Sequence, residues 1–272
     1  MRGMFTCGVI DVFLENHIVF DAAAGISAGA AFGCNFKSRQ IGRPIRYNKQ
    51  YCRDPRYCSF RSLLKTGDLY GAEFCYHTLP DELDVFDRAA FQADPMVFYA
   101  GATDVETGAA AFHRCVDAGA EDIAWLRASA SMPFVSRPVE IGGRFYLDGG
   151  IADAVPYRYM EELGFDRNVI VLTQPKGYEK KKSPGSPLYG LLLRRYPAVA
   201  RAMATRHDMY NGQLREIMQR EEAGVSLVIR PPEALGIHRT EKNPRELERV
   251  YQIGCREAEK RLGDIKRFLG IG

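Results

Sequence analysis

The chain has 272 residues, of which 46% are hydrophobic and 26% charged, a composition typical of a soluble globular protein. Its net charge of +3 is too small to indicate a nucleic-acid partner, and no apolar run is long enough to predict a transmembrane helix. The seven cysteines have no CxxC spacing, which favours reduced thiols and a cytoplasmic protein.

Strands alternate with helices along the chain, which predicts an α/β fold. The first expected element is an amphipathic helix over 3–16, and Asp11 and Glu15 interrupt its apolar residues, so we do not interpret it as a signal peptide. The later elements that we expect are a buried strand over 18–24, a helix over 28–37, loops and short helices over 39–64, a strand over 95–104 with its hairpin partner over 109–113, a helix over 121–131, a hairpin of strands 139–141 and 144–147, a short helix over 156–163, a strand over 168–173, a polar loop over 176–187, a helix over 188–218, a strand over 225–229 and a helix over 244–269.

The stretch from Val19 to Ala30 leads from small apolar residues into Gly25-Ile26-Ser27-Ala28-Gly29. A Gly-x-Ser-x-Gly sequence between a buried strand and a helix has the form of a nucleophile elbow. Glycines on both flanks of the serine would avoid the collisions that a Cβ would cause, and the N-terminus of the next helix would favour developing negative charge. The alternative is a small-residue turn that only lets a helix pack close to a strand.

The second candidate stretch is Leu147-Asp148-Gly149-Gly150. An aspartate at the end of a strand, followed by two glycines, can present its carboxylate at the edge of a sheet. Taken alone, Asp-Gly usually makes a turn or caps a helix. Together with Ser27, however, Asp148 supplies the base that a serine nucleophile needs.

With two further stretches, these motifs resemble the patatin-like phospholipases, and their bacterial branch most closely. Ala128-Ser129-Ala130-Ser131-Met132-Pro133 matches the family's Ser-x-x-x-P sequence, and Met1-Arg2-Gly3 looks like the end of its Gly-Gly-Gly-x-Arg-Gly oxyanion motif. The resemblance implies a three-layer α/β/α sandwich with a mainly parallel central sheet. We expect one domain over 1–272, with its core over about 1–175 and a helical C-terminal extension over about 188–272.

The resemblance also implies hydrolysis of acyl esters in lipids, of the phospholipase A or lysophospholipase type, through an acyl-serine intermediate and without cofactor or metal. An aspartate of ordinary pKa, ~3.9, is a weak base, and burial would raise that pKa toward what proton abstraction needs. The residues that the resemblance assigns are the nucleophile Ser27, the general base Asp148, the motif glycines Gly25, Gly29, Gly149 and Gly150, and Arg2 and Gly3 in support of the oxyanion site.

The family's donor glycines would precede the position of Met1. We therefore expect either slow hydrolysis by the chain that begins at Met1 or a natural start further upstream, because loss of one oxyanion donor costs about 3 kcal/mol. Two alternatives stay open. One is a non-catalytic lipid-binding or regulatory protein, and the other is an α/β-hydrolase in which His207 or His238 completes a triad with Ser27 and Asp148.

A membrane surface is a further expected partner. Leu188–Leu193 stands beside Arg194 and Arg195, and Lys180–Lys182 comes just before it. Apolar side chains with neighbouring basic residues can bind an anionic lipid surface without spanning it. The alternative is that the leucines pack in the core while the lysines solvate a loop.

The basic stretch over 39–64 predicts a solvated face, with an electropositive rim for an anionic head group as the alternative. Its cations are Arg43, Arg46, Lys49, Arg53, Arg56 and Arg61. A zinc site is conceivable nearby, although its spacing matches no known site. Its ligands would be Cys52, Cys58, Cys75 and His77.

Overall fold

The computed structural model describes residues 1–271. The elements of the first half are α1 (Gly3–Glu15), β1 (Ala22–Ile26), α2 (Ala28–Lys37), α3 (Arg43–Tyr51), α4 (Phe60–Thr66), the π-helix η1 (Phe74–Leu83), α5 (Arg88–Ala93), β2 (Val97–Asp104), β3 (Ala110–Cys115) and α6 (Ala120–Ala130). Those of the second half are β4 (Val139–Ile141), β5 (Arg144–Asp148), η2 (Gly149–Ile151), α7 (Tyr157–Glu162), β6 (Asn168–Val171), η3 (Ser186–Leu188), α8 (Tyr189–Leu192), α9 (Pro197–Glu222), β7 (Ser226–Ile229), α10 (Pro244–Lys260) and α11 (Leu262–Leu269).

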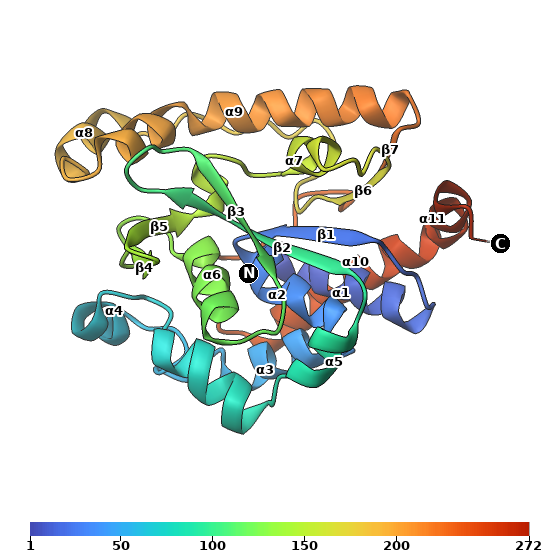
Figure 1. Cartoon of the computed structure of the whole chain (residues 1–272), viewed down its shortest axis with the longest axis horizontal. Helices are drawn as coiled ribbons and strands as arrows, with labels where there is room; N and C mark the ends of the chain where they lie inside the picture. Colours follow the sequence, from blue (N-terminus) through green and yellow to red (C-terminus); the bar gives the residue numbers. More distant parts are fainter. Residues whose placement is uncertain (272) are drawn as a thin grey trace.

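The strands form a middle layer between two layers of helices (Figure 1). Helices α7 and α9 lie on one side of the strands, and α1, α2, α6 and α10 lie on the other. Helix α2 packs on β1, and α6 packs on β2 and β5. The three-layer α/β/α class expected from the sequence is therefore confirmed.

The strand pairings are mixed. Strand β1 runs parallel to β2, and β6 runs parallel to β7 in a second, two-stranded sheet. Strand β2 is antiparallel to both β3 and β5, and β4 and β5 form an antiparallel hairpin. Because β3 pairs along nearly all of β2, β1 and β5 must share the opposite edge of that strand.

The edge of β2 that β1 and β5 share determines where Ser27 and Asp148 lie. Strand β1 pairs with the first part of β2 up to Gly101, whereas β5 returns in the opposite direction and its last pair joins Asp148 to Ala102. The carboxyl ends of β1 and β5 therefore meet at adjacent positions of β2. Ser27, which follows β1, is thus brought beside Asp148, which ends β5.

Helix α10 packs closely along α1 through two glycines. A Cβ at Gly254 would lie 2.0 Å from the carbonyl oxygen of Phe5, and one at Gly8 would lie 2.2 Å from that of Tyr251. Buried residues of α10 also share one hydrophobic core with those of α1 and α2. Helix α10 therefore helps to hold α1, which precedes the elbow formed by β1 and α2.

Several element boundaries differ from the sequence expectation. The strand expected over 18–24 runs from Ala22 to Ile26, because the chain first turns at His17, where φ is +54°. The helix expected over 188–218 is divided before Pro197, whose ring fits the first turn of a helix but not its interior. The helix expected over 244–269 is divided at Arg261. The π-helix η1 and α5 were not expected.

The basic stretch is largely the solvated face that its composition predicts, because five of its six cations are exposed: Arg46, Lys49, Arg53, Arg56 and Arg61. Arg43 is buried, with its guanidinium on the carbonyl of Asp84 and the amide oxygen of Asn35. Arg46 also pairs with Asp84, and Lys49 pairs with a carboxylate of α10. Arg43 is therefore the exception in this stretch, and the pairs of Arg46 and Lys49 lie at the surface.

Among residues 1–271, no helix combines the length and the apolar character needed to cross a bilayer.

Candidate active site

Ser27 lies at a strained strand-to-helix turn. Its backbone has φ +56° and ψ −118°, a conformation that a non-glycine residue seldom adopts. A Cβ at Gly25 would lie 2.4 Å from the carbonyl oxygen of Gly29, so this position requires glycine. A Cβ at Gly29 would meet no atom within 4 Å. The expectation that both glycines avoid collisions is therefore right for Gly25 and wrong for Gly29, which instead leaves open space beside the serine.

Ser27 and Asp148 are in direct contact. The Ser27 hydroxyl donates a hydrogen bond to Oδ2 of Asp148 at 2.6 Å, and Oδ1 of Asp148 accepts the N–H of Gly150 at 2.8 Å. Only 3% of Asp148 is exposed. Burial raises the pKa of its carboxyl group, and the Ser27 hydroxyl and the positive charge of Arg206 partly oppose that rise.

The end of α6 holds both residues in place. Oγ of Ser129, which is fully buried, accepts the backbone N–H of Ser27 at 2.9 Å and donates to the carbonyl of Gly101 at 2.5 Å. The carbonyl of Ser131 accepts the backbone N–H of Asp148 at 2.8 Å. The Ser-x-x-x-P stretch thus fixes the backbones of the nucleophile candidate and of its carboxylate partner.

Residues of strand β2 contact the backbone of Asp148 and Gly149. Thr103 Oγ1 donates to the carbonyl of Asp148 at 2.9 Å and accepts the N–H of Ala152 at 3.2 Å. A Cβ at Gly149 would lie 2.3 Å from the carbonyl oxygen of Gly101, so that glycine permits the close approach of β5 to β2. The Asp-Gly-Gly stretch is therefore a strand end that places its carboxylate toward the elbow, and not merely a turn.

Arg2 and Gly3 lie at the start of α1. Gly3 is buried, and a Cβ there would lie 2.7 Å from the ring of Phe32, so Gly3 lets α1 pack on α2. Arg2 is exposed. Both line the cavity described next, but within residues 1–271 neither donates a hydrogen bond to Ser27 or Asp148.

A cavity of about 1150 Å³ opens at Ser27 and Asp148. Much of its wall is apolar and can accommodate an acyl chain. Apolar residues near the elbow that line it are Ile26, Ala28, Phe32, Ile123, Leu126 and Met132. Cationic residues that line it are Arg2, Arg39, Arg43, Arg167, Lys180, Arg206 and Arg239.

Neither histidine of the alternative triad reaches the site. Nε2 of His207 lies 3.4 Å from a carboxylate oxygen of its neighbour Asp208, and the carbonyl of His238 accepts the ammonium group of Met1. Neither residue lines the cavity. The direct Ser27–Asp148 hydrogen bond moreover leaves no position for an imidazole between them, so the geometry does not support a triad.

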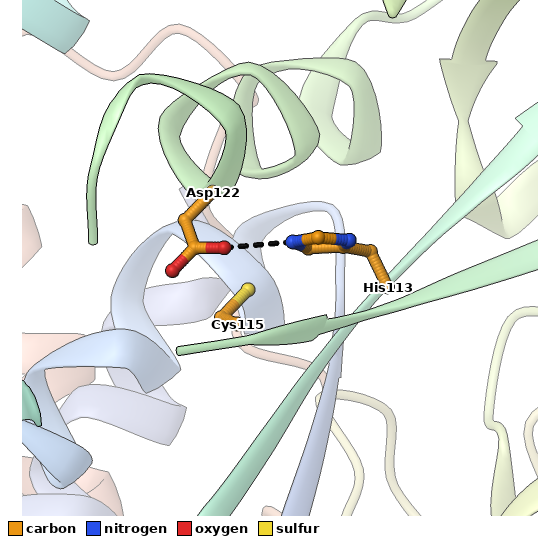
Figure 2. A group of neighbouring side chains, drawn as sticks. All are labelled: His113, Cys115 and Asp122. Atoms are coloured by element: carbon orange, nitrogen blue, oxygen red, sulfur yellow. Dashed lines mark hydrogen bonds and ion pairs between the residues drawn. The ribbon is translucent and has the colours of Figure 1, made fainter. Parts of the chain in front are cut away.

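A second group of chemically active side chains lies on β3 and α6 (Figure 2). Nε2 of His113 and Oδ1 of Asp122 are 2.7 Å apart, and the thiol of Cys115 lies close to both. Burial alone would raise the pKa of Asp122, but hydrogen bonds from His113 and from three backbone N–H groups lower it overall. Oδ2 of Asp122 accepts the N–H groups of Val116, Asp117 and Ala118, so the carboxylate caps the turn between β3 and α6.

The zinc site considered from the sequence does not form. In the part of the chain that the structure describes, the grouping of three or more close metal-ligating side chains is His113, Cys115 and Asp122, and it includes none of the four expected ligands. Cys52 and Cys75 instead lie against backbone carbonyls, those of Lys242 and Tyr57 among them.

Sequence models of protein families match two parts of the chain. The sequence model described as patatin-like phospholipase matches residues 1–160, more than half of the chain. The chain belongs to the patatin-like phospholipase family. Both Ser27 and Asp148 lie inside the matched range, and the match supports a lipid hydrolase in general. A second sequence model, a domain of unknown function (DUF6363), matches residues 196–270 of this patatin-like protein.

The patatin-like chain is also similar to a protein of Escherichia coli (strain K12) that bears the name "Uncharacterized protein YjjU". The two are 29% identical over 182 residues, which cover 64% of this chain and 49% of that protein. The chain thus spans about half the length of this curated relative.

Sequence reasoning gave no role to several residues of the site. Ser129 was recognised only as part of a motif, and nothing in the motif shows that its hydroxyl holds Ser27. The sequence groups Lys180 with Lys181 and Lys182 as a basic run that contacts a membrane or solvates a loop, whereas Lys180 is half-buried and lines the cavity. Arg206 and Arg239 carried no local signal, because nothing near either of them in the sequence distinguishes it from the other basic residues of its segment.

Proposed function

We propose that this chain is a lipid acyl hydrolase in which Ser27 is the nucleophile and Asp148 the only general base. The 2.6 Å hydrogen bond from the Ser27 hydroxyl to the buried Asp148 carboxylate carries the proposal. A serine hydroxyl needs an adjacent base to attack an ester, and this contact supplies one. The strained backbone at Ser27 supports it, since strain of this kind concentrates at functional sites.

The chemical steps follow from this contact. Oγ of Ser27 attacks the ester carbonyl carbon while its proton passes to Oδ2 of Asp148. The tetrahedral species collapses, the bond to the alcohol oxygen breaks, and that oxygen takes the proton from Asp148. A water molecule then attacks the acyl-serine, giving its proton to Asp148, and the fatty acid leaves as Ser27 regains a proton.

The N-terminus of α2 can stabilise the oxyanion of each tetrahedral species. Ala28 directly follows the nucleophile. Its backbone N–H lies in the first turn of α2 and has no partner within that helix. Open space at Gly29 leaves room for the ester beside that turn. The expected slow hydrolysis by the chain that begins at Met1 stays a prediction.

A covalent probe tests the nucleophile. A fluorophosphonate, which resembles the tetrahedral species of acyl transfer, should label Ser27 and should leave Ser27→Ala unlabelled. Labelling at another serine, or none in the folded protein, would overturn the assignment.

Variants of the bases separate a dyad from a triad. Asp148→Asn should lower ester hydrolysis by about 10³-fold or more, whereas His207→Ala and His238→Ala should keep most of it. Because burial raises the pKa of Asp148, kcat/KM should fall as the pH drops through a value above the ordinary aspartate range, where the carboxylate gains its proton. A loss of similar size in either histidine variant would contradict the dyad.

A further inference from the structure

Four of the cationic side chains that line the cavity of Ser27 and Asp148 come from four distant segments and are near enough for their charges to interact. We call them the cationic wall. They are Arg2 at the start of α1, Lys180 in the loop after β6, Arg206 on α9 and Arg239 before α10. Three of the four lie beyond the range that matches the patatin-like family, and Arg206 and Arg239 fall in the C-terminal match.

The fold holds these side chains near the reacting groups. Nε of Arg206 donates to the carbonyl of Gly150, and Nη2 of Arg206 lies 2.9 Å from the position that a Cβ on Gly150 would take. Oδ1 of Asp148 lies 3.0 Å from that same position. The guanidinium group of Arg206 is therefore a close neighbour of the proposed base.

Contacts with Asn211, Tyr210 and Tyr70 hold Lys180 and Arg239 in place. The backbone N–H and C=O of Lys180 both bond to the side chain of Asn211, and its ammonium group lies over the ring of Tyr210 at 5.4 Å. Tyr210 stands four residues after Arg206 on α9, so both lie on one face of that helix. The hydroxyl of Tyr70 donates to the carbonyl of Arg239 at 2.9 Å.

The side chains of the cationic wall form no ion pair with a carboxylate in the described chain, although Arg206 lies near Asp148. Within residues 1–271, none of these four side chains takes part in an ion pair, whereas Arg43, Arg46, Lys49 and Arg56 all do. Burial, and after it the positive charges of Arg206, Arg2 and Arg239, lower the pKa of Lys180 to about 8. Such an arrangement opposes folding unless an anion binds it.

We propose that the cationic wall binds the phosphate of the substrate, so that the preferred substrates are acyl esters that carry a phosphate beside the ester. This inference rests on the proposed hydrolase function. Arginine side chains recognise phosphate through paired, charge-assisted hydrogen bonds, and a lysine adds a point charge. The position of Arg206 beside Asp148 places the phosphate close to the scissile ester, as in a lysophospholipid.

A matched pair of substrates tests the proposal. 1-Oleoylglycerol 3-phosphate and 1-oleoylglycerol share the acyl chain, the ester and the glycerol, and differ only in the phosphate. In nonionic detergent at low salt, kcat/KM should be higher for the phosphate ester by about tenfold or more, since only that ester can form charge-assisted hydrogen bonds with the cationic wall. Added salt should reduce the ratio.

Variants of the cationic wall should lower the ratio of kcat/KM for the phosphate ester to kcat/KM for the neutral ester. Lys180→Gln and Arg239→Gln should each reduce the selectivity for the phosphate ester by about tenfold, because neither side chain hydrogen-bonds to the Ser27–Asp148 pair. The matched controls are Lys181→Gln, an exposed neighbour in the same loop, and Arg201→Gln, an exposed arginine on α9. Both controls should leave the two rates unchanged.

The outcomes separate this inference from the proposed function. Equal rates on both esters, or variants that lower both rates equally, would overturn the phosphate site and leave the hydrolase intact. Failure of the fluorophosphonate and of both esters would overturn the hydrolase. In that event, calorimetry of Ser27→Ala with glycerol 3-phosphate still tests whether the cationic wall binds phosphate. Binding that Lys180→Gln and Arg239→Gln weaken would support the phosphate site. The absence of binding would overturn it. Inorganic phosphate bound as tightly as the lysophospholipid would overturn the assignment to a lipid head group.

Discussion

The two walls of the cavity differ in how their polar groups are satisfied. The catalytic wall, which we define as Ser27, Thr103, Ser129 and Asp148, lies within the family match, and each of its side chains has a hydrogen-bond partner. The side chains of the cationic wall form no ion pair within residues 1–271, although Arg206 lies near Asp148. A satisfied network fixes atoms in one geometry, whereas unpaired charges remain available to a ligand.

This difference predicts two kinds of variant. A change in the catalytic wall should alter the chemical step and therefore lower the rates on neutral and phosphorylated esters by the same factor. A change in the cationic wall should alter their ratio. Comparing the two esters in each variant consequently assigns a residue to one wall or the other.

The largest effect is expected from the glycine that shapes the elbow. In Gly25→Ala, the new Cβ would lie 2.4 Å from the oxygen of Gly29 and 2.6 Å from the nitrogen of Ala30, backbone atoms that cannot move aside easily. We expect the free energy of unfolding to fall by about 3 kcal/mol. The control Gly29→Ala meets open space and should leave stability unchanged or raise it by up to about 1 kcal/mol. Equal losses in denaturant unfolding would contradict the elbow geometry.

A smaller effect is expected from Ser129→Ala. It leaves the N–H of Ser27 and the carbonyl of Gly101 without their partner, a loss of about 1–3 kcal/mol. We expect kcat/KM to fall by about tenfold to hundredfold on both esters, with their ratio unchanged. Ser131→Ala is the control, because its hydroxyl bonds only to the carbonyl of Arg127, one turn earlier, while its carbonyl still accepts from Asp148. If Ser131→Ala lost as much activity, the role given to Ser129 would be wrong.

The local parts of the catalytic wall could be predicted from the sequence. The elbow around Ser27 is a strand, a turn and a helix in succession, and Asp148 ends a strand, so each has a signal within a few residues. Their meeting depends on β1 and β5 approaching one edge of β2 from opposite directions, which no short stretch encodes. The role of Ser129 depends on that same tertiary arrangement.

The cationic wall could not be predicted, for a physical reason. Charge in a sequence shows local density, whereas the effect of a charge depends on its partners in space. The dense basic stretch over 39–64 suggested a charged surface, which is right for most of its cations but wrong for Arg43, which is buried against Asp84. Arg206 and Arg239 are 33 residues apart in the sequence and come to line one cavity only after folding.

The smallest effect is expected at an outer surface that belongs to neither wall. Leu193 is buried, but Leu188, Leu191 and Leu192 at α8 are 56%, 69% and 60% exposed, and Lys181 and Lys182 precede them. Core packing therefore accounts only for Leu193. Helix α4, whose Phe60 and Leu64 are also exposed, lies at the same end of the molecule (Figure 1).

We propose that this end of the molecule contacts anionic membranes, which is a question of location and not of chemistry. Sedimentation with anionic vesicles should be measurable at low salt and should decrease as salt rises. Lys181→Gln with Lys182→Gln should weaken binding by roughly fivefold per lysine, since a basic residue near such a surface contributes about 1 kcal/mol. Leu191→Ser with Leu192→Ser should weaken it as well, whereas Val225→Ser, an exposed apolar residue beyond the other end of α9, should not. All these variants should hydrolyse a short-chain soluble ester at the parent rate. Equal binding to neutral and anionic vesicles, or unchanged binding in both double variants, would exclude α8 from the membrane contact.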